Sequence, residues 1–254
     1  MLTGLLSSFM LLFGDAQIES FYVVDLDKSI KMYVTTIPRR QEADAILSVY
    51  ASTYKEFNRE YKKQLKELLQ KNIDYYTPEQ WYQDFFKKTI DDRQKLQSSF
   101  ISTRLRLEEV INQEEWDKIL ETTTANLEKL VEKNMKKKEK KEGKKKGNDP
   151  YMRISKTIKE TIPPGEKQTG SLEALANFKE KYKMIGKSYE NLNNNEAKAL
   201  ANRQSTKEDL QEICNSFNKL RKSLIDSYVE LVFNLKDNAT EQEWSIIVKD
   251  LNNF

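Results

Sequence analysis

The sequence predicts an all-α protein built from two tandem copies of an elongated helical-hairpin module with long antiparallel helices. Composition is the first reason: among 254 residues only seven are Gly and five are Pro, 33% are charged, and mean hydropathy is −0.78. Long helices exposed to solvent have this profile. The second reason is that the chain matches itself, without a gap, when it is shifted by 128 residues. The match pairs roughly residues 22–120 with residues 150–248.

Apolar positions and helix starts carry this internal match. The paired positions include Leu47, Tyr50, Tyr54 and Tyr61 with Leu175, Phe178, Tyr182 and Tyr189, and Arg93, Leu96, Phe100 and Leu107 with Arg221, Leu224, Tyr228 and Leu235. An internal repeat defines the structural unit, so it decides how the chain is divided. We expect an N-terminal segment (1–20), a first helical repeat (21–120), a Lys-rich linker (121–149) whose start can extend the last helix of that repeat, and a second helical repeat (150–254).

The N-terminal residues 2–13 form an apolar run with the length of a signal-peptide hydrophobic region. Small residues at Gly14 and Ala16 would allow cleavage after Ala16, which predicts export to the periplasm or cell envelope. No Lys or Arg precedes the run, however, and it is shorter than the roughly 20 residues of a membrane span. The first alternative is an uncleaved membrane anchor within residues 1–24, with the body of the protein in the cytoplasm. The second alternative is that the run forms a buried helix of a cytosolic protein.

Each repeat is predicted to contain four helices. The first is short, over about 21–36 and again over about 151–162, and prolines follow both. The second is long and runs from near Arg39 to Ile73, with apolar side chains at helical spacing. Its copy starts near Ser171, and we expect a kink or break where Asn193, Asn194 and Asn195 follow one another.

The third helix of each repeat is predicted to start with a capping box. In this arrangement the side chains at the N-cap and at N3 each accept a hydrogen bond from the other residue's backbone N–H. Thr77 with Gln80 fits the pattern in the first repeat, and Ser205 with Glu208 fits it in the second. The helical pattern then continues for about 33 residues, which at a rise of 1.5 Å per residue gives a rod of roughly 50 Å.

The fourth helix has the clearest start signal. The predicted N-cap and N3 pairs are Asn112 with Glu115 and Thr240 with Glu243. Trp116 and Trp244 follow at N4, opposite Ile111 and Ala239, in the positions of a hydrophobic staple. The shared Glu-Trp pair therefore has a structural explanation that needs no ligand.

The linker is strongly basic, while the rest of the chain is slightly acidic. Nine Lys and two Glu lie between Lys133 and Lys146, whereas the whole chain has a net charge of +3. Clustered lysines attract phosphates. This run contains no Arg and no aromatic residue for stacking on bases. A connection between the repeats is favoured over nucleic-acid binding.

Few residues suggest chemistry. The chain has no His, and its single cysteine, Cys214, aligns with Phe86, which predicts a core position. Arg93 and Arg221 are the only arginines that align between the copies. They are predicted either to form an ion pair with the facing helix of their own repeat or to provide one anion-recognition point per repeat. No catalytic, cofactor-binding or metal-binding residues are predicted.

The segment Tyr76-Thr77-Pro78-Glu79-Gln80 resembles the Leu-Thr-Pro-x-Gln signature of Spy/CpxP-like periplasmic proteins, the LTxxQ-motif family. The second copy, residues 204–208, departs from it at the Leu and Gln positions. The resemblance implies an all-helical periplasmic chaperone or stress protein. No functional residue is transferred from that family.

These observations favour a non-enzymatic scaffold or adaptor of the cell envelope that binds protein partners through duplicated helical modules. Two modules on a flexible linker can raise avidity by about 10²–10⁴-fold. The alternative is a Spy/CpxP-like chaperone, for which we expect an exposed apolar patch in each module. Membrane association through residues 1–24 is possible. The sequence does not define the oligomeric state.

Overall fold

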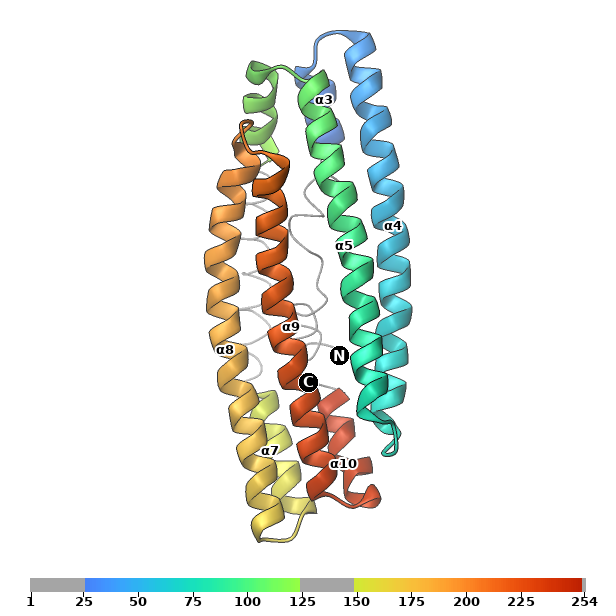
Figure 1. Cartoon of the computed structure of the whole chain (residues 1–254), viewed down its shortest axis with the longest axis vertical. Helices are drawn as coiled ribbons and strands as arrows, with labels where there is room; N and C mark the ends of the chain where they lie inside the picture. Colours follow the sequence, from blue (N-terminus) through green and yellow to red (C-terminus); the bar gives the residue numbers. More distant parts are fainter. Residues whose placement is uncertain (1–25, 124–148, 253–254) are drawn as a thin grey trace.

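A computed structural model of the protein describes residues 26–123 and 149–252 (Figure 1). Every regular element in these two ranges is a helix, so the predicted all-α class is confirmed. The expected N-terminal signal or anchor and most of the Lys-rich linker lie outside the described residues. Within the described residues, no helix has the length and apolar character needed to span a membrane.

Each half of the chain contains a long helical hairpin flanked by short helices. In the first half these are α3 (Leu26–Tyr33), α4 (Ile37–Ile73), α5 (Glu79–Val110) and a helix that starts at residue 113. In the second half they are α7 (Pro150–Thr161), α8 (Glu166–Ala201), α9 (Lys207–Asn238) and α10 (Glu241–Asn252). The turn between α7 and α8 contains Pro163 and Pro164, which cannot continue a helix, and Gly165, whose φ of +152° favours glycine.

The four long helices lie side by side in the order α8, α9, α5 and α4, each antiparallel to its neighbour (Figure 1). The turn of the first hairpin is at one end of the bundle and the turn of the second is at the other. Helices α7 and α10 pack at the first of these ends, where α10 also contacts α4. Contacts between the halves are therefore made along α5 and α9 and through α10.

The core consists of two hydrophobic clusters, and each takes side chains from both halves of the chain. The α10 cluster combines second-half residues such as Ile158, Leu235 and Trp244 with first-half Leu68 and Tyr82. The α3 cluster combines second-half Leu210 and Cys214 with first-half residues that include Leu26, Ile30, Tyr50, Phe100 and Trp116. Cys214 is buried there, as its alignment with Phe86 predicts. Each buried large apolar side chain contributes about 1.5–3 kcal/mol, so both clusters hold the halves together.

The predicted break in the second long helix is wrong, because α8 is helical without interruption from Glu166 to Ala201. Asn costs at most about 0.7 kcal/mol per residue in a helix interior. Packing of α8 along α9 outweighs this intrinsic cost. The helix also starts five residues before the expected Ser171, directly after Gly165.

Two predicted capping boxes require correction. The N-cap of α5 is Pro78, without a side-chain cap; the Thr77 hydroxyl instead donates to the Lys71 carbonyl at 2.9 Å, and Gln80 donates to Asp84. The N-cap of α9 is Thr206, one residue after the predicted Ser205, and Asp209 replaces Glu208 at N3. The Ser205 hydroxyl donates to the Ala199 carbonyl at 2.7 Å. In both turns the predicted residue closes the preceding helix.

The fourth helix of each half starts with reciprocal hydrogen bonds. Glu115 N–H donates to Asn112 Oδ1 at 2.9 Å, and Asn112 N–H donates to Glu115 Oε2 at 3.1 Å. In the second half Thr240 N–H donates to Glu243 Oε2 at 2.7 Å, and Glu243 N–H donates to Thr240 Oγ1 at 3.3 Å. The tryptophans that follow, Trp116 and Trp244, are fully buried.

Candidate docking groove

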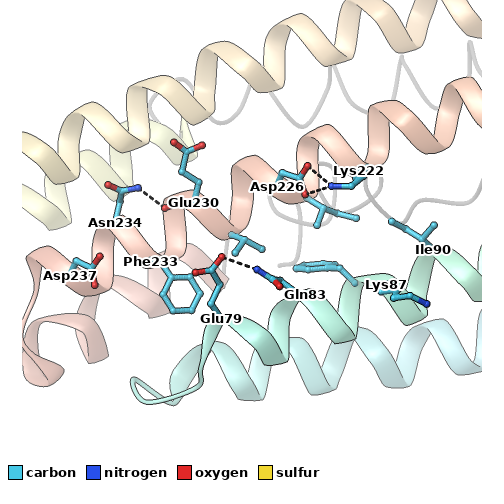
Figure 2. Close-up of a pocket in the computed structure, with 13 residues that line it drawn as sticks. Glu79, Gln83, Lys87, Ile90, Lys222, Asp226, Glu230, Phe233, Asn234 and Asp237 are labelled. Atoms are coloured by element: carbon cyan, nitrogen blue, oxygen red, sulfur yellow. Dashed lines mark hydrogen bonds and ion pairs between the residues drawn. The ribbon is translucent and has the colours of Figure 1, made fainter.

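A groove of about 720 Å³ opens between α5 and α9, toward the end of the bundle that holds the α4–α5 turn. Figure 2 shows Phe233 of α9 beside Glu79 and Gln83 of α5, whereas Glu230 and Asn234 point from α9 away from α5 in this view. The groove extends from Glu79 to Ile90 on α5 and from Lys222 to Asp237 on α9. At 1.5 Å per residue these stretches measure about 16 and 22 Å.

The floor of the groove is apolar because both helices place hydrophobic side chains one turn apart. Phe86 and Ile90 provide it from α5, and Ile225, Val229 and Phe233 provide it from α9. Residues four apart lie on the same helix face. Ile90 and Phe233 are only partly buried, so apolar surface faces the groove. The groove is thus open, with a hydrophobic base.

The rims of the groove are charged, with an excess of carboxylates. They carry the carboxylates of Glu79, Asp226, Glu230 and Asp237 and the ammonium groups of Lys87 and Lys222. Both lysines are already paired on their own helices, Lys87 with Asp91 at 2.8 Å and Lys222 with Asp226 at 2.7 Å.

Three rim carboxylates therefore lack a cation among the described residues: Glu79, Glu230 and Asp237. Glu79 accepts a hydrogen bond from the Gln83 amide at 3.0 Å (Figure 2). Glu79 and Asp237 are at the end of the groove nearest the α4–α5 turn. No ion pair among the described residues neutralises these two carboxylates, although the N-terminal dipole end of α5 offsets part of the charge of Glu79.

Lys236 fixes the two helices at this acidic end. Its buried ammonium donates to the carbonyls of Asp74 at 3.1 Å and Thr77 at 3.3 Å, in the α4–α5 turn. It also lies 5.3–5.5 Å from the ring centroids of Tyr82, Phe233 and Trp244. Burial lowers the pKa of Lys236 to about 8, and the Asp74 carboxylate offsets part of this shift. The cation thus joins the start of α5 to the end of α9, on which the groove is built.

Asn72 makes a second connection at the same end. Its side chain is fully buried; the amide donates to the Tyr228 hydroxyl at 2.7 Å and to Asn252 Oδ1 at 2.9 Å. Its carbonyl oxygen accepts from the Tyr82 hydroxyl at 3.1 Å. The backbone carbonyl of Asn72 accepts from the Trp244 indole at 3.0 Å. This single residue therefore links α4 to α5, α9 and α10.

Arg93 and Arg221, the aligned arginines, lie close together in the middle of the bundle, where both line one small cavity. Each is at most 5% exposed. Arg221 donates to Asn218 at 2.9 Å and to the Tyr189 hydroxyl at 3.3 Å, while the Arg93 guanidinium lies 5.1 Å from the Phe57 ring centroid.

The cavity measures only about 10 Å³. A water molecule needs roughly 10–15 Å³ on this measure, so the space is too small for a phosphate or carboxylate. The structure therefore brings the two arginines together but gives them no preformed anion site.

Sequence reasoning missed the groove, although one signal for it was present. Under the expected 128-residue repeat, Ile90 and Ile225 align with Asn218 and Gln97. The structure shows what this difference does: Gln97 and Asn218 bond to each other across α5 and α9 at 2.8 and 3.3 Å. The pair equivalent to Ile225 and Ile90 of the groove is thus a hydrogen-bonded contact.

Comparison with known protein families, curated proteins and solved structures finds no match to this chain. Among the described residues, no group of three or more His, Cys, Asp or Glu side chains is arranged to hold a metal ion.

Proposed function

We propose that this protein acts by binding rather than by catalysis, as a scaffold or adaptor of the cell envelope that docks a protein partner in the groove between α5 and α9. The groove itself carries the proposal. It combines an apolar floor with a charged rim, which is how protein interfaces divide into a hydrophobic centre and a polar periphery. Its length suits a short segment of a partner.

We propose that the scaffold arose from a duplicated helical module. Helices α5 and α9 both start and end 128 residues apart. The hydroxyls of Thr77 and Ser205, also 128 residues apart, both donate to a carbonyl six residues earlier. These equivalent local bonds support a common ancestor for the two halves.

The proposed binding site belongs to only one end of this duplicated scaffold. Near the middle of the two helices Gln97 and Asn218 occupy the positions equivalent to Ile225 and Ile90 and bond to each other. The two modules therefore share their fold but differ at this surface. We therefore prefer binding of one partner at one end of the scaffold to the avidity that two similar faces would give.

A photo-crosslinking experiment tests the proposed docking site. Asn234, exposed on the groove rim, is replaced with p-benzoylphenylalanine, and Asn215, exposed on the same helix but outside the groove, serves as the matched control. In cells of the source organism, we expect a defined protein adduct from position 234 that position 215 does not give. Equal adduct patterns from both positions would refute docking in the groove.

An aggregation assay separates the scaffold from the Spy/CpxP-like chaperone. A scaffold should not slow the aggregation of an unfolded client at equimolar concentration. Suppression that disappears when the groove is altered would favour the chaperone. Fractionation with N-terminal sequencing tests the envelope location: a mature start at Gln17 supports export, and an intact Met1 in the membrane fraction supports the anchor.

A further inference from the structure

We infer that the partner segment is an amphipathic α-helix whose apolar stripe is flanked by lysine or arginine. This inference rests on the proposed docking function and specifies the chemistry of its ligand. Three properties of the groove support it: its shape, the spacing of its floor and the charge of its rim.

The shape of the groove fits a helix. Its walls are two antiparallel helices, and its apolar side chains repeat at four-residue intervals, at 86 and 90 on α5 and at 225, 229 and 233 on α9. A helix lying between them would present anchors at i, i+3 or i+4, and i+7, as in other helix-in-groove complexes. The wall lengths of about 16–22 Å correspond to a helix of about 11–15 residues.

The charge of the rim favours a basic partner. Glu79, Glu230 and Asp237 have no cation among the described residues, whereas Lys87 and Lys222 are paired within their helices. Asp237 is also in the last turn of α9, where the C-terminal end of the helix dipole adds partial negative charge. Basic side chains at one end of the partner helix would complement this region and set its direction.

The Lys-rich run of this chain does not meet both requirements. Between Lys133 and Lys146 it has nine Lys but only one apolar side chain, Met135. It could neutralise the rim but would leave Ile90 and Phe233 uncovered. A separate partner with both an apolar stripe and basic flanks satisfies both parts of the groove.

Fluorescence anisotropy with a designed peptide tests the inference on the whole protein. The probe is a labelled helix of about 15 residues with leucines at i, i+3/i+4 and i+7 spacing and lysines beside them; a second peptide carries glutamates in place of the lysines. We expect saturable binding of the basic peptide and at least about tenfold weaker binding of the acidic one.

Two double variants with the same change of net charge make the test specific. Glu230→Lys with Asp237→Lys alters the groove rim, and Glu67→Lys with Glu173→Lys alters exposed positions on α4 and α8. The rim variant should bind the basic peptide about tenfold more weakly and gain affinity for the acidic one. The control variant should change either affinity less than twofold. All replaced side chains are exposed, so each variant should keep the wild-type circular dichroism spectrum.

The outcomes separate this inference from the proposed function. If neither peptide binds, or both bind equally, while position 234 still gives a partner adduct, the basic-helix inference is wrong and docking in the groove stands. A dimer in sedimentation velocity that the rim variant abolishes would identify a second copy as the occupant. Cross-links from position 234 to residues 133–146 would identify the chain's own Lys-rich run. Each of these two results would overturn the inference.

Discussion

Replacing Asn72 with alanine should destabilise the entire bundle. The side chain makes three hydrogen bonds: those to Tyr228 at 2.7 Å and Tyr82 at 3.1 Å are buried, and that to Asn252 at 2.9 Å is partly buried. Each such bond contributes about 0.5–1.5 kcal/mol, and a buried partner left without its bond costs about 1–3 kcal/mol. We therefore expect the free energy of unfolding to fall by about 3–5 kcal/mol. That is a large share of a total of about 5–15 kcal/mol.

Urea denaturation measures this loss. With a slope of about 2–3 kcal/mol per molar, the midpoint should fall by roughly 1–2.5 M. Far-UV circular dichroism reports helix content, and tryptophan fluorescence reports both clusters, because Trp244 belongs to the α10 cluster and Trp116 to the α3 cluster. Each cluster contains residues of both halves. Circular dichroism and tryptophan fluorescence should therefore give the same unfolding midpoint for the wild-type protein.

The exposed Asn215 provides the control, and its replacement with alanine should change stability by less than about 0.5 kcal/mol. A loss below about 1 kcal/mol for Asn72→Ala would contradict the role given to its hydrogen bonds. Separate transitions for the two signals in the wild-type protein would contradict the shared core.

Three further predictions concern other residues. Burial raises the pKa of Glu115, but bonds from Arg39 and the Asn112 backbone hold it below its usual value; Arg39→Met should cost about 1–2 kcal/mol at pH 7, and urea titrations should show this difference disappearing as pH falls through the folded-state pKa. Because the pKa of Lys236 is about 8 in the folded protein, the unfolded chain binds more protons than the folded one above pH 8. The free energy of unfolding of the wild-type protein should therefore rise between about pH 8 and 10 relative to that of Lys236→Met. The same pH dependence in urea melts of both proteins would refute this. Cys214→Ala should cost about 1 kcal/mol in urea melts and leave partner cross-linking unchanged, whereas loss of cross-linking with an intact fold would contradict its core role.

Local sequence patterns predict much of the fold and little of the site. The helix starts at Asn112 and Thr240 depend on residues three positions apart, so the sequence contains the whole interaction. At the start of α9, Ser205 with Glu208 and Thr206 with Asp209 both fit a capping box, and only the structure shows that the second pair forms it. Local propensity cannot choose between such neighbours.

The groove depends on interactions between distant residues. Asn72 and Tyr228 are separated by 156 positions, and Lys236 bonds the Asp74 carbonyl 162 positions away. No periodicity reveals which faces of α5 and α9 meet or where they separate. The aligned arginines show the same limit: sequence predicted their pairing with facing helices or an anion, and the structure places them beside one small cavity.

The division of the α10 cluster between the two halves has a consequence for synthesis on the ribosome. Leu68, Tyr82, Phe85 and Phe86 are translated early, but their packing partners Trp244, Ile247 and Leu251 lie in α10, the last of the described helices. The first hairpin, which ends at Val110, therefore leaves the exit tunnel with apolar side chains that stay exposed until about 140 more residues have been added. At 5–20 residues per second, this interval lasts roughly 10–30 s. During that time the nascent chain has an uncovered apolar surface that a general chaperone can bind.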